Sequence, residues 1–227
     1  MPNGLRAGDR PQVLAGREWL APGLLVLAIL QLGAAPAPLD CPAGAGPAGA
    51  PPPAGTREWC ALPDGTQHGP SRSYHANGRL RAEARFDHGR LEGPYREWTA
   101  SGALALEGSY RAGQKQGLFT AWYPDGTKKW EEGWRDGVQH GPARSWHANG
   151  RPMGEMRYDA GKLDGMARTW FSNGQLQAEG VFAAGVRDGT WKAWWEDGRL
   201  QKVAVFDHGR ELSRRVLPHH DLSGAER

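Results

Sequence analysis

Large aromatic side chains recur along most of the chain at a fixed interval, with short polar segments between them. One series repeats every 24 residues, and a second series follows each of its members after twelve. The central aromatics are Tyr74, Trp98, Trp122, Trp146, Trp170 and Trp194, and the closing aromatics are Phe86, Tyr110, Trp134, Tyr158, Phe182 and Phe206. Short aromatic-rich runs that are bounded by turn residues predict β-strands.

Three series of glycines keep the same period without a single insertion. They are the opening glycines Gly69, Gly93, Gly117, Gly141, Gly165 and Gly189, the turn glycines Gly78, Gly102, Gly126, Gly150, Gly174 and Gly198, and a third set at Gly89, Gly113, Gly137, Gly161, Gly185 and Gly209. Six full units therefore start at residues 69, 93, 117, 141, 165 and 189. Units of this size bury their apolar surface only against their neighbours.

A turn sequence separates the two aromatics of every unit. The six tetrads are Ala-Asn-Gly-Arg, Ala-Ser-Gly-Ala, Pro-Asp-Gly-Thr, Ala-Asn-Gly-Arg, Ser-Asn-Gly-Gln and Glu-Asp-Gly-Arg. Asn-Gly and Asp-Gly between such runs are strong hairpin signals. Pro124 suits the first inner position of a type I turn, so we expect a three-residue loop with Gly126 left-handed and a bulge. That register pairs Tyr74 with Leu80, and we expect Phe86 to share their face.

These patterns predict an all-β fold, an elongated single-layer antiparallel array of about six 24-residue β-hairpin repeats. The array covers residues 57–212, with ten or more strands and almost no helix between 69 and 212. The composition of 33 Gly, 17 Pro and a single Ile argues against a thick aliphatic core. The last unit has Val203 where the others have Glu, which is typical of a terminal cap, and residues 213–227 read as a polar tail.

The N-terminal part has a different character. Residues 1–37 combine a basic start with a short apolar run, which is typical of a signal peptide or a membrane anchor. Lipidation at Cys41 is a third alternative, although the preceding Asp40 fits that signal poorly. Residues 38–56 are rich in Pro, Ala and Gly and read as a linker. We therefore expect an exported, periplasmic or membrane-anchored protein at the cell envelope, in which Cys41 and Cys60 could form a disulfide.

Charge and motifs exclude several classes of function. The formal net charge is only +3, from 28 basic and 25 acidic residues, so nucleic acid is not an expected partner. We find no nucleophile elbow, phosphate loop or zincin motif, and expect no catalytic residues and no cofactor. No spacing of the eight histidines suggests three ligands for one metal, and we expect no metal site. The recurring glutamates Glu83, Glu107, Glu131, Glu155 and Glu179 are expected to pair with basic neighbours or accept bonds from turn amides.

Basic residues recur two positions before most central aromatics. They are Arg72, Arg96, Arg144, Arg168 and Lys192, with Thr120 in the third unit. Strand alternation places them on the face of Tyr74, Trp98, Trp122, Trp146, Trp170 and Trp194. One interpretation is a recognition strip for a partner protein, because Arg, Trp and Tyr dominate interface energetics. The other is an internal ladder in which each guanidinium stacks on a ring and covers it.

The repeated pattern resembles the membrane occupation and recognition nexus (MORN) repeat in its bacterial variant. Trp170-Phe-Ser-Asn-Gly-Gln-Leu-Gln-Ala-Glu-Gly-Val-Phe182 carries the resemblance most closely, and the pattern spans residues 57–212. The resemblance implies a non-catalytic module that binds or scaffolds another protein, and some members are labelled antitoxins, so a toxin is one expected partner. The alternative is a structural spacer, or a membrane-associated repeat protein without a specific partner. Pro152 departs from the pattern, where Leu is usual.

Overall fold

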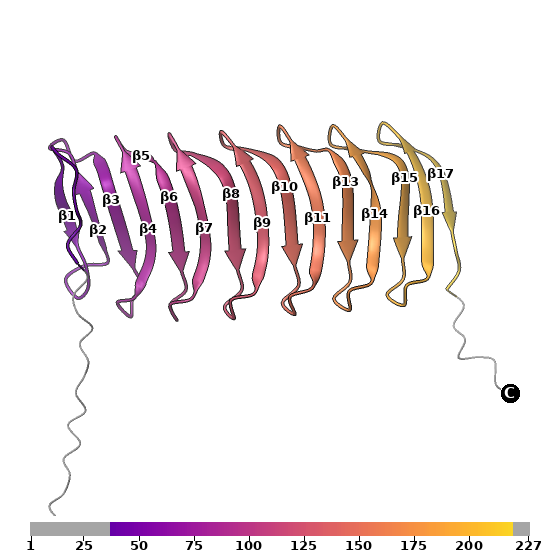
Figure 1. Ribbon diagram of the computed structural model, residues 1–227, viewed down its shortest axis with the longest axis horizontal. Coiled ribbons are helices and arrows are strands. Elements are labelled where there is room, and N and C mark those ends of the chain that lie inside the picture. Colours follow the sequence, from indigo (N-terminus) through magenta and orange to yellow (C-terminus); the bar gives the residue numbers. More distant parts are fainter. Residues whose placement is uncertain (1–36, 220–227) are drawn as a thin grey trace, which may run out of the picture. The chain divides into compact units, whose positions relative to one another are not determined.

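A computed structural model describes residues 37–219, and these form one antiparallel sheet of 17 strands. The strands follow one another across the sheet in chain order, and backbone pairing also links each hairpin to the next (Figure 1). None of the residues from 37 to 219 lies in a helix, and that range therefore contains no helix able to cross a membrane. The predicted all-β hairpin array is confirmed. The signal or anchor predicted for residues 1–37 lies almost entirely outside the described residues.

The hairpins of the six units are built from the longer strands of the sheet. The strands are β1 (Gly46–Ala50), β2 (Arg57–Ala61), β3 (Gln67–Tyr74), β4 (Leu80–Asp87), β5 (Arg90–Leu91), β6 (Gly93–Trp98), β7 (Leu104–Arg111), β8 (Gln114–Trp122), β9 (Lys128–Arg135), β10 (Val138–Trp146), β11 (Pro152–Asp159), β12 (Lys162–Leu163), β13 (Gly165–Trp170), β14 (Leu176–Ala183), β15 (Val186–Trp194), β16 (Leu200–Asp207) and β17 (Arg210–Val216).

The turn inside each unit has the predicted geometry. In the first unit the His75 amide donates to the Arg79 carbonyl at 2.8 Å, and the Gly78 amide donates to the His75 carbonyl at 2.9 Å. Gly78 is left-handed, with φ of 79°. Asn77 accepts a bond from the Arg79 amide at 3.1 Å, which explains the preference for Asn or Asp before the glycine. The turn glycines therefore cap three-residue hairpins with a bulge, and Tyr74 pairs with Leu80 as expected.

A second kind of turn joins one unit to the next. His88 and Gly89 both have positive φ, 44° and 79°, between the paired residues Asp87 and Arg90. This is a two-residue type I′ turn, and every later connection repeats its positive φ values. The opening glycines are also left-handed, so each of the three glycine series occupies a backbone conformation that other residues adopt at a cost. That shared requirement explains why the period contains three glycines.

The bulge corrects one prediction about the faces of the sheet. Ser73 pairs with Ala82 and Tyr74 with Leu80, so Arg81 is an extra residue that interrupts the alternation of β4. The closing aromatic Phe86 therefore lies on the opposite face from Tyr74, not on the same one. We call the face of the central aromatics and the recurring Arg and Glu residues the ladder face, and the face of the closing aromatics the ring face.

The ring face holds a thin core. Phe119 is fully buried and lies edge-on to Tyr110 and Trp134, with ring centroids 5.4 and 6.4 Å away. A Cβ on Gly108 would lie 2.4 Å from the Phe119 ring, so this glycine makes room for it. The other buried apolar side chains of this face are small or belong to the last unit, as Ala121, Ala143, Ala167, Ala204 and Phe206. Pairing of the backbone, rather than a thick core, therefore connects the units.

Both ends of the array extend beyond the predicted boundaries. Gly46–Ala50, within the expected linker, forms β1 and pairs with β2, and Cys41 and Cys60 form a disulfide. Backbone pairing with β2 and the Cys41–Cys60 disulfide hold this segment in place, although it contains few large apolar residues. At the other end β17 continues to Val216, past the predicted limit of 212, because its backbone pairs with β16.

Candidate functional site

A continuous row of charged residues crosses the ladder face at the middle of the strands. The register places these residues opposite one another on successive strands: Glu58, Arg72, Glu83, Arg96, Glu107, Thr120, Glu131, Arg144, Glu155, Arg168, Glu179, Lys192, Val203 and Arg215. Basic and acidic side chains alternate along most of the row. Opposite charges on directly opposed residues stabilise a sheet.

The ion pairs show that the recurring arginines have carboxylate partners inside the protein. Arg144 bonds to Glu131 and to Glu155, both at 3.1 Å, so it bridges two units. Arg72 likewise lies 3.5 Å from Glu58 and 3.2 Å from Glu83. Arg96 and Arg168 pair with Glu107 and Glu179 at 3.7 and 3.5 Å. The predicted pairing of these glutamates with basic neighbours is confirmed.

Thr120 breaks the alternation in the third unit, and a lysine compensates for it. Lys128 lies 2.9 Å from Glu131, whose side chain is only 7% exposed. Burial by itself raises the pKa of Glu131, but its bonds to Lys128 and Arg144 outweigh burial and lower that pKa overall. The bonds that Arg144 makes to Glu131 and to Glu155 raise the pKa of Arg144. The carboxylate of Glu131 is therefore held in its charged form.

The central aromatics are partly covered. Tyr74 is buried and donates its hydroxyl to Glu58, and burial followed by this bond raises the pKa of Tyr74 to about 12. The five tryptophans of the series have intermediate exposure, so none is fully buried or fully exposed. Lys128, not an arginine of the row, lies over the Trp146 ring at 5.5 Å. Arg72, Arg96, Arg144 and Arg168 contact glutamates, and within residues 37–219 no arginine of the row stacks on a central ring.

Two shallow grooves on the ladder face carry arginines outside the row. The first is lined by Pro70, Arg72, Glu83, Arg85, Pro94 and Arg96, and the second by Pro142, Arg144, Glu155, Arg157, Met166 and Arg168. They occupy equivalent positions three units apart. Arg85 and Arg157 are exposed, and neither has a carboxylate partner among residues 37–219. Each groove thus contains three guanidinium groups and one carboxylate.

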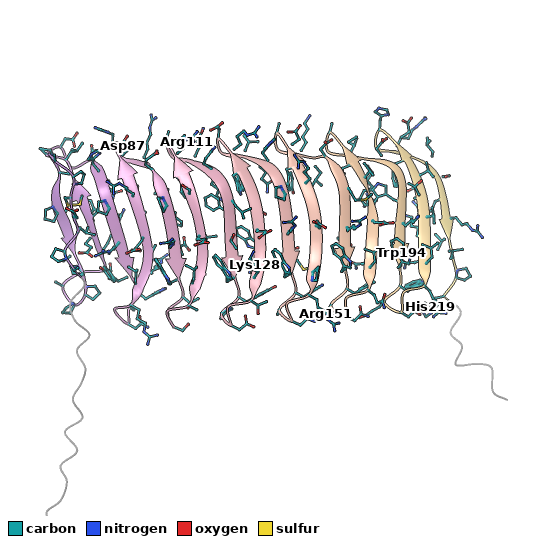
Figure 2. The ribbon with its side chains drawn as sticks, in the orientation of Figure 1. Asp87, Arg111, Lys128, Arg151, Trp194 and His219 are labelled. Carbon is teal, nitrogen blue, oxygen red and sulfur yellow. A yellow bond between two sulfur atoms is a disulfide. The ribbon has the colours of Figure 1, made fainter. Side chains whose placement is uncertain are left out.

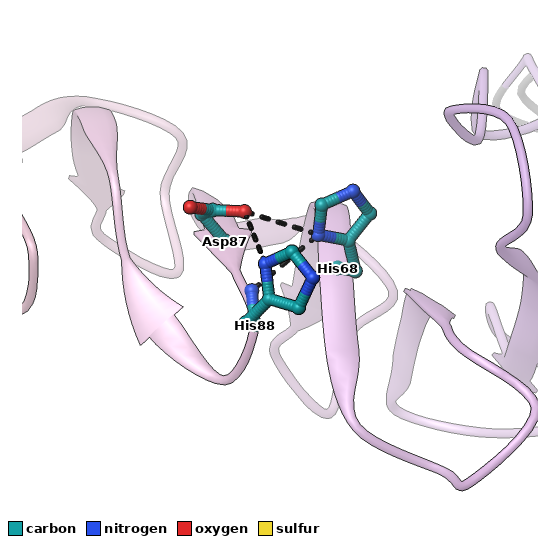
Figure 3. A group of neighbouring side chains, drawn as sticks. All are labelled: His68, Asp87 and His88. Carbon is teal, nitrogen blue, oxygen red and sulfur yellow. Dashed lines mark hydrogen bonds and ion pairs between the residues drawn. The ribbon is translucent and has the colours of Figure 1, made fainter.

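Two side-chain groups at the turns between units were not predicted from the sequence. His68, Asp87 and His88 approach one another around one of these turns (Figure 3), and Asp188, Asp207 and His208 do so five units later. Asp87 lies along the edge formed by the turns between units, whereas Arg151 and His219 lie toward the opposite edge (Figure 2). The sequence Phe-Asp-His-Gly-Arg, which occurs at 86–90 and again at 206–210, was the signal that could have indicated them.

Comparison with known proteins identifies the kind of repeat. Residues 67–88 and 163–184 match the family model of the MORN repeat variant. The two segments begin four repeat lengths apart, in the register set by the glycines. No curated protein matches the chain. Repeats of this kind generally bind proteins and are typically non-catalytic.

Proposed function

We propose that the protein is a non-catalytic scaffold whose ladder face binds an acidic, extended segment of another protein. The observation that supports this most directly is the pair of equivalent grooves. Each groove presents one arginine without a carboxylate partner in the described residues, Arg85 or Arg157. The other two arginines of each groove are paired with glutamates of the charged row. Arginine is enriched where proteins recognise carboxylates, because its planar fork donates two parallel bonds.

We place the recognition residues at Arg85 and Arg157, outside the strip of basic residues and central aromatics that the sequence predicted. The charges of Arg72, Arg96, Arg144 and Arg168 are engaged by the glutamate row, so we assign them mainly to holding adjacent units together. Lys192 has no glutamate at the next position of the row, since Val203 stands there. Trp146 and Trp170 line a hollow that also includes Arg144 and Glu155 of the second groove.

A synthetic acidic peptide tests the grooves without a natural partner. Arg85→Ser with Arg157→Ser removes both unpaired charges, and Ser109 already occupies the equivalent place in the second unit, so the fold should tolerate the change. We expect fluorescently labelled oligoglutamate to bind the double variant at least about tenfold more weakly than the wild type. Arg111→Ala with Arg135→Ala, which removes the same charge at the inter-unit turns, is the matched control. Equal losses in both variants would mean unspecific attraction and would refute the proposal.

A spacer without a specific partner is the second candidate function, favoured by the covered state of the central aromatics. A bare binding surface would expose several adjacent rings, whereas Tyr74 is buried and the tryptophans are only partly exposed. A spacer requires a stiff array but no particular groove charge. Absence of any difference between oligoglutamate and oligolysine binding would favour this function.

We also propose that the protein acts outside the cytoplasm, at the cell envelope. The disulfide between Cys41 and Cys60 supports this, since such bonds persist mainly in oxidising compartments, and the apolar N-terminal run suits export or anchoring. The antitoxin role implied by the resemblance would add a secreted toxin as the acidic partner. Alkylation of intact cells with and without reductant tests the location: free thiols at both cysteines without reductant would contradict it.

A further inference from the structure

We propose that His68, Asp87 and His88 form a binding site for a divalent transition-metal ion such as Zn²⁺. The ligands would be Nδ1 of both imidazoles and one carboxylate oxygen of Asp87. Each of the three residues offers one ligand atom within 4.8 Å of those of the other two. The site is separate from the ladder-face grooves and does not depend on the proposed binding of a partner protein.

The fold brings the three residues together from separate parts of the sequence. Gly69 pairs with Phe86 across the first hairpin, so His68 and Asp87 meet one step further toward the edge. His88 follows in the type I′ turn, where the Gly89 amide donates to the Gln67 carbonyl at 2.8 Å and fixes the turn against β3. All three side chains therefore project from backbone that is hydrogen-bonded on both sides, and they meet at one point (Figure 3).

The separations between the atoms suit a metal with short bonds. A tetrahedral ion that binds nitrogen and oxygen at about 2.0–2.1 Å separates its ligand atoms by about 3.3 Å. The Asp87 oxygen lies 3.3 Å from His68 Nδ1 and 2.7 Å from His88 Nδ1. Small rotations of the two imidazole rings would complete the geometry, and the long 3.4 Å bond from the His88 amide to His68 Nδ1 would be given up.

The donor set favours ions of the zinc type. Two imidazoles with one carboxylate suit Zn²⁺, Cu²⁺, Ni²⁺ or Fe²⁺, whereas Ca²⁺ and Mg²⁺ prefer oxygen ligands alone. Three protein ligands leave a fourth position for water or for a group from a partner. Asp64 in the adjacent turn adds nearby negative charge; bonds from Thr66 lower its pKa most, and attraction to His88 lowers it further. The equivalent group of Asp188, Asp207 and His208 has only one imidazole and should bind such an ion more weakly.

The other units supply matched controls. Ala112, Ala160 and Ala184 occupy the position of His88 in the same left-handed conformation, so His88→Ala should leave the fold intact. The fourth unit is incomplete in one respect only: His140 Nδ1 and Asp159 lie 3.1 Å apart, and Ala160 stands where the second imidazole would be. Ala160→His should therefore complete a further site of the same kind.

Competition of the full oxidised chain with a chromophoric zinc chelator tests the proposal. We expect one tight Zn²⁺ site in the wild type, loss of at least about tenfold in affinity with His88→Ala, and two tight sites with Ala160→His. His219→Ala should leave the tight site unchanged, since His219 lies near Asp197 at a different turn. Wild-type affinity in His88→Ala, or no added site with Ala160→His, would overturn the assignment and leave the three residues as a surface ion-pair cluster.

Discussion

Phe119→Ala should produce a large loss of stability, even though the fold has little core. The ring is fully buried, and its edge contacts with Tyr110 and Trp134 each contribute about 0.5–1.5 kcal/mol beyond burial. Truncation of a buried Phe to Ala costs about 3–5 kcal/mol, so we expect about 4 kcal/mol. Ala143 and Ala167 occupy the equivalent strand position in later units, which shows that alanine there is compatible with the register.

Gly108→Ala provides the complementary change. The added methyl group would lie 2.4 Å from the Phe119 ring, and overpacking of this kind costs about 1–3 kcal/mol. In the double variant the methyl group instead enters the space that the ring has vacated. The double variant should therefore lose about 1–2 kcal/mol less than the sum of the two single losses.

Urea denaturation measures these losses, provided that two probes agree. Tryptophan fluorescence and far-ultraviolet circular dichroism should give coincident transitions, since repeat arrays can unfold in stages. Midpoint and slope then give the free energy of unfolding of each variant. A loss below about 1 kcal/mol for Phe119→Ala, or strictly additive losses in the double variant, would refute the packing of the ring against Gly108.

Three further changes test other parts of the array. The pKa of Glu131 is lowered in the folded state, so its ion pairs should stabilise the protein above about pH 4.5 and lose that contribution as the pH falls through and below this value. Glu131→Gln should therefore make the free energy of unfolding depend less on pH in the acidic range. Ala112→Asn should raise the free energy of unfolding by about 0.5–1 kcal/mol in urea denaturation, because Asn tolerates the left-handed conformation at φ of 50° better than Ala; a decrease would contradict the turn assignment. Replacing Cys41 and Cys60 together by Ser should cost about 3 kcal/mol and speed amide hydrogen exchange in β1, and unchanged exchange there would mean that backbone pairing alone holds this strand.

The hairpin register could be predicted because the residues of each turn determine its loop geometry. Pro124 and the glycine after an Asn or Asp admit few loop geometries, and five of the six units carry an Asn-Gly or Asp-Gly pair at this place. The pairing of Tyr74 with Leu80 followed from the loop alone. Which face Phe86 would occupy did not follow, because a single bulged residue, Arg81, reverses the alternation for the rest of the strand.

Interactions between units were harder to predict from the sequence. Glu131 and Arg144 meet only once the pairing between hairpins is known, and the type I′ turns that set such pairings often use Ala where Asn is usual. His68 and Asp87 are 19 residues apart, a spacing that matches no familiar metal motif. The strand at Gly46–Ala50 was missed for a different reason: its order comes from a partner strand and a disulfide, not from its own residues.

The charged row also affects how the number of repeats can change during evolution. Arg72, Arg96, Arg144 and Arg168 each face a glutamate on both neighbouring strands of the row, as Arg144 does with Glu131 of the unit before it and Glu155 of its own unit. Duplication of a 24-residue unit that carries both charges, such as residues 141–164 with Arg144 and Glu155, would therefore join an acid to a base again at the new junction. Recombination within such a gene can lengthen or shorten the array without inventing a new interface, whereas a shift of one residue would place every turn glycine out of position.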